Sequence, residues 1–184
     1  MQTVVLVEGA SDRAAVEAVA RRRGVCLEEH DVRVEPMGGA TSIRRFLTRH
    51  LDAEVRIAGL CDAGEEGWFR RALEHAGYGA VRDRSDLEAL GFFVCDTDLE
   101  DELIRALGVG AVHQVVERAG DLRALRSLQR QPAQRERTSE EQVHRFLGSG
   151  SGRKERYARL LVEALPPHAV LRPLDALLTH VLAG

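Results

Sequence analysis

The stretch Thr3-Val4-Val5-Leu6-Val7-Glu8-Gly9-Ala10-Ser11-Asp12 decides how this chain folds. Its apolar run is rich in β-branched valine, which predicts a strand that is buried on both faces. A glutamate and a glycine end the run, and a helical pattern follows at once, with Ser11 or Asp12 as its N-cap. Glu8 therefore stands at the carboxyl end of a buried strand, where open α/β sheets bind their ligands.

The alternation of strand, loop and helix repeats along the first half of the chain. Further strands are predicted at residues 31–35, 55–60 and 92–95, and helices at residues 12–23, 41–51 and 68–76. Beyond Val109 the patterns are helical only, at residues 110–119, 121–130, 139–147, 154–165 and 173–182. We therefore expect a Rossmann-like α/β domain at residues 1–108, with a four-stranded, mostly parallel sheet flanked by helices. A C-terminal helical extension, residues 109–184, is expected to pack on it.

Composition narrows the class of protein. The chain has 184 residues, 44% of them hydrophobic, which suffices for a sizeable core. It contains no apolar run long enough for a membrane span and begins without the basic and apolar regions of a signal peptide. Cys26, Cys61 and Cys95 match neither a disulfide framework nor a metal-binding spacing. They are predicted to be reduced packing residues of a cytoplasmic protein.

Charge is distributed unevenly along a chain whose net charge is only −3. Arginines crowd residues 118–159, whereas the first half is acidic. Solvated helix faces are the usual cause of such a distribution, and a phosphate-binding surface beside a metal site is the alternative. Among 26 basic residues Lys154 is the one lysine, which is consistent with a need for a compact ammonium at that position.

Acidic side chains follow three of the four predicted strands. The groups are Glu8 with Asp12, Asp62 with Glu65 or Glu66, and Asp98 with Glu100 or Asp101. Each acid at a helix start could simply cap the helix. Several close carboxylates, however, do not all ionise unless a multivalent cation neutralises them, and oxygen ligands favour Mg²⁺ or Mn²⁺. The three acidic strand ends together predict a metal site.

Two segments carry a family resemblance. Val5-Leu6-Val7-Glu8-Gly9, followed later by Leu60-Cys61-Asp62, resembles a topoisomerase-primase (Toprim) domain, which has a glutamate after its first strand and an Asp-x-Asp pair after its third. Glu8-Gly9-Ala10-Ser11-Asp12, with Asp98-Leu99-Glu100-Asp101 after the fourth strand, is closest to the Toprim domain of OLD (overcoming lysogenisation defect) nucleases. The resemblance covers residues 3–108 and implies a four-stranded parallel sheet and two-metal nuclease chemistry on DNA.

The resemblance also implies roles for individual residues. Glu8, Asp12 and Asp62 would be metal ligands, and Asp98 and Glu100 would serve a second metal. Lys154, beyond the fourth strand, would stabilise the negative charge that develops on the phosphate. The catalytic set is then Glu8, Asp62 and Lys154.

The sequence departs from the family pattern in two places. Gly64 stands where the second acid of Asp-x-Asp belongs, and Glu65, one residue later, is kept as a candidate ligand. The phosphate loop of the ATPase part of OLD nucleases has no counterpart in this chain. The resemblance thus implies either a separate ATPase partner or a stand-alone Toprim protein.

The sequence leaves three functions open. The first is a Mg²⁺- or Mn²⁺-dependent hydrolase of phosphodiester bonds, acting on DNA in preference to RNA by a two-metal mechanism. The second is a Toprim module that binds metal or phosphate without cleaving and works with a partner ATPase. The third is nucleotidyl transfer, as in primases.

Other residues are expected to be structural. The seven histidines lack ligand spacing and are predicted to be solvated or core residues. Trp68 and Phe69 are predicted to be core residues, with stacking on a base as the alternative. Gly38 and Gly39 are expected to form a turn, with a place in the lining of the crevice as the alternative.

Overall fold

The computed structural model describes residues 1–50, 54–150 and 152–183. Its sheet is formed by β1 (Thr3–Val7), β2 (Val32–Pro36), β3 (Arg56–Asp62) and β4 (Phe92–Cys95). All pairs are parallel and the order is β2-β1-β3-β4. The predicted parallel sheet is confirmed, with β2 at one edge and β1 beside β3, so the carboxyl ends of the four strands share one edge of the sheet.

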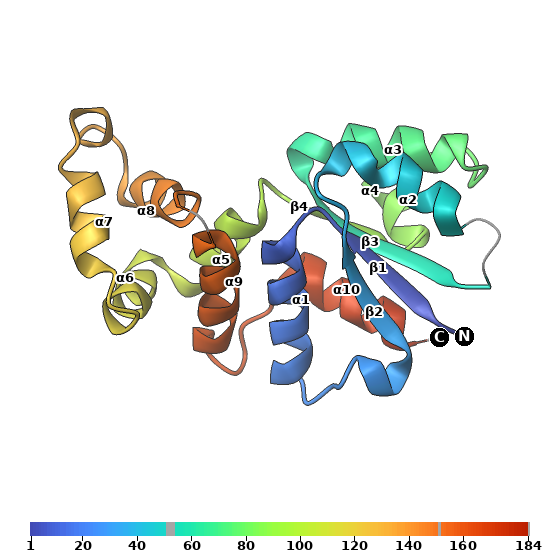
Figure 1. Ribbon diagram of the computed structural model, residues 1–184, viewed down its shortest axis with the longest axis horizontal. Coiled ribbons are helices and arrows are strands. Elements are labelled where there is room, and N and C mark those ends of the chain that lie inside the picture. The colour runs from blue at the N-terminus through green and yellow to red at the C-terminus, as the bar shows by residue number, and fades with distance from the viewer. Residues whose placement is uncertain (51–53, 151, 184) are drawn as a thin grey trace.

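Helices cover both faces of this sheet (Figure 1). Those of the first part are α1 (Ala10–Arg22), α2 (Ile43–His50), α3 (Glu66–His75), α4 (Arg84–Ala89) and α5 (Leu99–Leu107). Those of the second part are α6 (Val109–Arg118), α7 (Leu122–Gln129), α8 (Ser139–Leu147), α9 (Arg153–Ala164) and α10 (Arg172–Leu182). Short 3₁₀ turns lie at Glu28–His30, Ala40–Ser42, Ala63–Glu65 and Pro132–Gln134. None of the helices in the described ranges is long and apolar enough to cross a membrane.

β1 divides the hydrophobic core into two layers because its side chains alternate between the faces of the sheet. Val4 and Leu6 pack with α2, α3 and α4, whereas Val5 and Val7 pack with α1 and the C-terminal helices. All four side chains are completely buried. The unbroken apolar run of β1 is therefore explained by a strand that has helices on both sides.

The C-terminal helices occupy two places. α6, α7 and α8 extend beyond the sheet, α9 returns along α1, and α10 packs against β3 and β4 (Figure 1).

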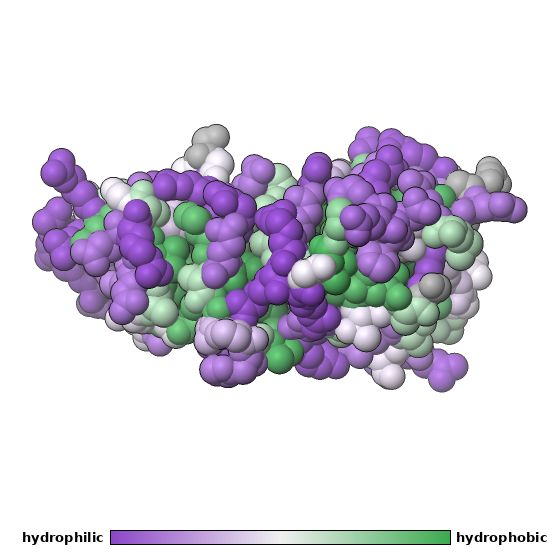
Figure 2. Space-filling view, turned by 90° about the horizontal axis from the view of Figure 1, so that it is seen from below, coloured by the Kyte–Doolittle hydropathy of each residue, from purple (hydrophilic) through white to green (hydrophobic). Residues whose placement is uncertain are grey.

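The face of the molecule that is seen from below is largely hydrophilic, with hydrophobic residues visible between the polar ones (Figure 2). The domain boundary between residues 108 and 109 stays a prediction.

Several local predictions need correction. Helix α4 was not predicted, because its six residues bury one side chain, that of Leu87. Cys26 is exposed and does not pack, whereas Cys61 and Cys95 are buried and free, as expected. The helix predicted to reach position 51 is described to His50, and residue 51 lies outside the described ranges.

The two aromatic residues at the start of α3 differ in burial. Phe69 is completely buried, as predicted, but Trp68 is 46% exposed. The prediction that Trp68 belongs to the core is wrong, because its position on α3 faces away from the sheet.

Candidate active site

The first group of site residues, called the first cluster, comprises Glu8, Asp12, Asp62 and Glu65. Glu8 follows the last residue of β1, and Asp62 ends β3 and precedes the 3₁₀ turn that carries Glu65. Because β1 and β3 are neighbouring parallel strands, their carboxyl ends deliver these acids to the same crevice.

Three turns lie around the first cluster. The backbone N–H groups of Gly38 and Gly39, both at positive φ, donate to the carbonyl oxygen of Glu8 at 3.0 Å. The N–H of Ala63 donates to the carbonyl oxygen of Thr97 at 3.2 Å. The turn after β2 is thereby held beside the end of β1, and the turns after β3 and β4 are held together. Gly38 and Gly39 form the predicted turn.

Asp12 reaches the crevice from the first turn of α1. The helix begins at Ala10, two residues before the predicted position 12, with Gly9 as its N-cap in place of Ser11 or Asp12. The Oδ2 of Asp12 accepts the N–H of Gly9 at 2.8 Å. This contact directs the carboxylate back toward the strand end that bears Glu8.

Burial and mutual repulsion raise the pKa values of carboxylates in the first cluster. Burial, together with the negative charges of Asp12 and Glu8, raises the pKa of Asp62 to about 8. Burial likewise raises the pKa of Asp12 to about 6. The pKa of Glu8 is raised by burial and then by the charges of Asp12 and Glu65. Ionisation of any one of them therefore opposes ionisation of the others.

A second cluster lies at the start of α5 and comprises Asp98, Glu100 and His144. Asp98 is the N-cap of α5 and accepts the N–H of Asp101 at 2.8 Å. The Nε2 of His144, on α8, is 2.7 and 3.0 Å from the two oxygens of Asp98. One ligand atom from each of the three residues lies within 4.8 Å of the others, a spacing that can hold a metal ion.

Lys154, in the first turn of α9, connects the two clusters. Its Nζ is 3.1 Å from the Oε2 of Glu100, a side chain that is almost completely buried. Burial lowers the pKa of Lys154, but the charges of Glu100, Asp98 and Asp62 outweigh that effect and raise it. The ammonium is therefore held charged beside both clusters.

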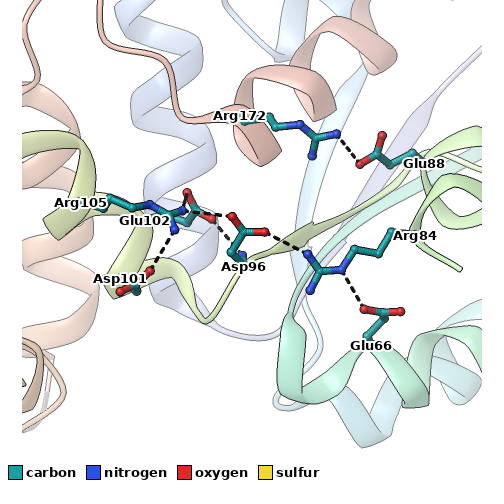
Figure 3. Close-up of polar contacts among 8 residues, drawn as sticks. All are labelled: Glu66, Arg84, Glu88, Asp96, Asp101, Glu102, Arg105 and Arg172. Atoms are coloured by element: carbon teal, nitrogen blue, oxygen red, sulfur yellow. Dashed lines mark hydrogen bonds and ion pairs between the residues drawn. The ribbon is translucent and has the colours of Figure 1, made fainter.

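Acidic residues that neighbour the two clusters form ion pairs with arginines (Figure 3). Arg84 lies between Glu66 and Asp96, with 3.0 Å to an oxygen of each. Arg105 contacts Glu102 at 2.7 Å and also reaches Asp96 and Asp101. In residues 1–50, 54–150 and 152–183, by contrast, no acid of the first cluster forms an ion pair with a basic side chain within 4.0 Å.

The donor set of the first cluster suits a hard divalent cation. The Oε1 of Glu8 is buried and has no hydrogen-bond partner among the described residues. All four side chains offer carboxylate oxygens, which Mg²⁺ and Mn²⁺ accept. The cluster is more open than the second, since within the described ranges no three of its oxygens lie as close as the ligand atoms of the second cluster.

The structure thus brings the predicted residues Glu8, Asp12, Asp62 and Glu65 to one crevice, with Asp98, Glu100 and Lys154 beside them. Of the alternatives left open by the sequence, Glu66 pairs with Arg84 and Asp101 with Arg105. His144 was assigned to the solvated or core histidines, and its contact with Asp98 is a finding of the structure alone.

The fold and the position of the acids define the class of protein. A parallel sheet of order β2-β1-β3-β4, with acids after β1, β3 and β4, has the arrangement expected of a Toprim-type α/β module. Comparisons with known proteins specify it further. The family model of the overcoming lysogenization defect protein-like TOPRIM domain matches residues 1–63, the part that contains Glu8, Asp12 and Asp62. The resemblance to OLD-like Toprim domains is thereby confirmed.

Solved structures share the fold over nearly the whole chain. The C-terminal region of the Burkholderia pseudomallei OLD protein has 18% identity and a TM-score of 0.70, with 98% of this chain and 97% of that chain covered. The C-terminal region of the Xanthomonas campestris pv. campestris OLD protein has 22% identity and a TM-score of 0.71, with 99% and 92% covered. No curated protein matches the chain. The helices from α5 to α10 therefore belong to a fold that these OLD regions also have.

Proposed function

We propose that this protein is a divalent-metal-dependent phosphodiester hydrolase that cleaves nucleic acid, DNA in preference to RNA. The observation that carries the proposal is the division of the acids into two sets. Glu66, Asp96, Asp101 and Glu102 are paired with arginines, whereas the first cluster has no such partner among the described residues. Carboxylates that are held together and left without a cationic side chain are suited to a metal cation.

The proposed ligands follow from the two clusters. Glu8, Asp12, Asp62 and Glu65 would hold one Mg²⁺ or Mn²⁺, and Asp98 and Glu100, with His144, would hold a second. Bound there, such ions supply Lewis-acid polarisation and neutralise negative charge on a phosphodiester. His144 contacts both oxygens of Asp98 and so fixes the orientation of that carboxylate.

Lys154 is proposed to act on the substrate phosphate directly. Its side chain is about half exposed, so the ammonium can exchange part of its contact with Glu100 for a phosphate oxygen. The neighbouring carboxylates keep it protonated. A preorganised cation beside the scissile phosphate stabilises the charge that develops during cleavage.

Basic side chains on the helices beyond the sheet supply a surface for the backbone of the nucleic acid. Seven arginines of the segment from α6 to α8 are exposed and form no ion pair within the described ranges; they are Arg118, Arg123, Arg126, Arg130, Arg135, Arg137 and Arg145. Guanidinium groups that are free of carboxylates can contact phosphates. The proposal includes a separate ATPase as partner and a cytoplasmic location, consistent with the free thiols of Cys61 and Cys95.

A module that binds nucleic acid without cleaving it is the second candidate. Gly64 favours it, because this residue is exposed and puts no carboxylate where the Toprim pattern has its second aspartate. The two candidates predict different consequences of losing Asp62. Binding alone survives loss of Asp62, whereas cleavage does not.

The test is an assay of cleavage on supercoiled and linear DNA with Mg²⁺ or Mn²⁺. We expect the wild type to nick or degrade DNA and Asp62→Asn and Lys154→Met to be slower by at least about 100-fold. Glu117→Gln is the matched control, since Glu117 is exposed on α6, away from both clusters. A wild type without activity, or with activity equal to that of Asp62→Asn, would contradict the proposal.

A further inference from the structure

The single tryptophan of the chain is placed unusually for so large an apolar residue. Trp68 is 46% exposed in the first turn of α3, whereas its neighbour Phe69 is completely buried. The guanidinium carbon of Arg71 lies over the indole ring, 4.9 Å from its centroid. The indole is therefore held by a cation and open to solvent, an arrangement that contributes little to the core.

Trp68 lines a cavity of about 320 Å³ between α2 and α3, two helices that lie side by side above the sheet (Figure 1). Thr41, Ile43, Arg44, Arg71 and His75 are among its other lining residues. The apolar part of the lining is formed by Ile43, Ala72 and Trp68, and the polar part includes two arginines and no acidic side chain. Small-ligand sites combine such apolar walls with a few placed polar groups.

The cavity lies next to the active-site crevice. Thr41 comes two residues after Gly39, whose N–H donates to the carbonyl oxygen of Glu8. Trp68 comes three residues after Glu65, whose charge raises the pKa of Glu8. The end of the cavity at Thr41 and Trp68 is thus within about one helical turn of the first cluster, whereas His75 lies about two turns further along α3. A strand whose phosphate lies at the crevice can place a neighbouring nucleotide at the near end.

We propose that this cavity, the Trp68 subsite, binds an unpaired base of the nucleic-acid strand next to the scissile phosphate. The inference rests on the proposed function and specifies its substrate as one with a single-stranded segment. Every base has a π-face that can stack on indole, and the guanidinium groups of Arg71 and Arg44 suit the adjoining phosphates. A base paired inside a duplex cannot enter, because its faces are covered by its neighbours.

The test uses the fluorescence of Trp68, which no other tryptophan obscures. Full-length protein is titrated in EDTA, where nothing is cleaved, with an oligothymidylate, with thymidine monophosphate and with a blunt duplex. We expect saturable quenching by the oligothymidylate, weaker quenching by the mononucleotide and none by the duplex. Asp62→Asn is expected to keep the quenching although it loses cleavage, so failure of the proposed function and failure of the subsite can be distinguished.

Substitutions check the stacking itself through the anisotropy of a labelled oligothymidylate. Trp68→Ala is expected to weaken its binding by about 5- to 150-fold, and Trp68→Phe by less. Tyr78→Ala is the matched control, because Tyr78 is an equally exposed aromatic residue, 40%, beyond the far end of α3. Its affinity is expected to be unchanged.

Three results would overturn the proposal. One is the absence of quenching at oligonucleotide concentrations that saturate the anisotropy signal. Another is equal affinity of Trp68→Ala and wild type. The third is a fluorescence that changes with protein concentration but not with oligonucleotide, since the cavity would then be a contact between copies of the chain.

Discussion

Neutralising Asp62 is expected to stabilise the metal-free protein while it abolishes metal binding by the first cluster. In the folded chain burial and the charges of Asp12 and Glu8 raise the pKa of Asp62 from 3.8 to about 8. In the unfolded chain the group ionises near its ordinary pKa. Between these two values the folded state binds more protons than the unfolded state, so the free energy of unfolding falls as the pH rises.

The size of the effect follows from the difference in pKa. About four pH units at 1.36 kcal/mol each set a ceiling of roughly 5–6 kcal/mol for an isolated, fully buried group. Asp62 is only partly buried and shares its protons with neighbouring carboxylates, which leaves about 2 kcal/mol after screening by solvent. For a chain of this length that corresponds to a rise in melting temperature of about 4–8 °C for Asp62→Asn.

Thermal unfolding in EDTA at pH 8 and at pH 5 measures this effect. We expect Asp62→Asn to melt above the wild type at pH 8 and to lose most of that advantage at pH 5, where Asp62 is largely protonated. Addition of Mn²⁺ at pH 8 is expected to stabilise the wild type through the first cluster by about 2.7 kcal/mol at 100 times the dissociation constant of that site, a contribution that the variant lacks. Glu117→Gln, an exposed substitution, should follow the wild type throughout.

The reasoning would be refuted by an Asp62→Asn protein that is no more stable than the wild type in EDTA at pH 8. A stability gain of the same size at both pH values would refute it as well, because the gain would then have another origin than proton binding. Equal stabilisation of both proteins by Mn²⁺ would remove Asp62 from the list of ligands.

Three further predictions concern single residues. Lys154→Met is expected to lower the rate of DNA cleavage by at least about 100-fold while the affinity for Mn²⁺, measured by calorimetry, changes only a few-fold, since the ammonium acts on the phosphate. His144→Gln is expected to weaken binding of the second Mn²⁺ by about 10- to 100-fold in the same titration and to leave the first site unchanged. Gly59→Ala is expected to lower the free energy of unfolding in urea by about 1–3 kcal/mol, because a Cβ there would lie 2.6 Å from a ring carbon of the buried Phe92. The corresponding prediction would be contradicted by an unchanged cleavage rate for Lys154→Met, an unchanged affinity for the second Mn²⁺ in His144→Gln, or an unchanged free energy of unfolding for Gly59→Ala.

The sheet was predictable because each of its strands has a recognisable pattern of apolar residues in the local sequence. The run from Val4 to Val7 is apolar at every position, which only a strand covered on both faces requires, and residues 92–95 were predicted with their observed bounds. Strand 31–35 alternates polar and apolar residues, as expected for the edge position that β2 occupies. What local pattern did not indicate was α4, since one buried leucine in six residues produces no periodicity.

The first cluster was predictable for a topological reason. In a parallel sheet every strand ends at the same edge, so acids that follow separate strands converge wherever the chain continues. Glu8 and Asp62 are 54 positions apart, yet the pairing of β1 with β3 brings them together. The resemblance added Lys154, which no periodicity would have selected.

The remaining features depend on contacts between elements whose packing a single sequence does not determine. Whether Glu65 or Glu66 faces the crevice is decided by Arg84, which comes from another helix and binds Glu66. His144 reaches Asp98 across 46 positions because α8 packs against α5, and no ligand spacing in the sequence records that approach. The arginines therefore contribute to the site indirectly: by binding the surplus acids they leave uncompensated those carboxylates that a divalent cation would occupy.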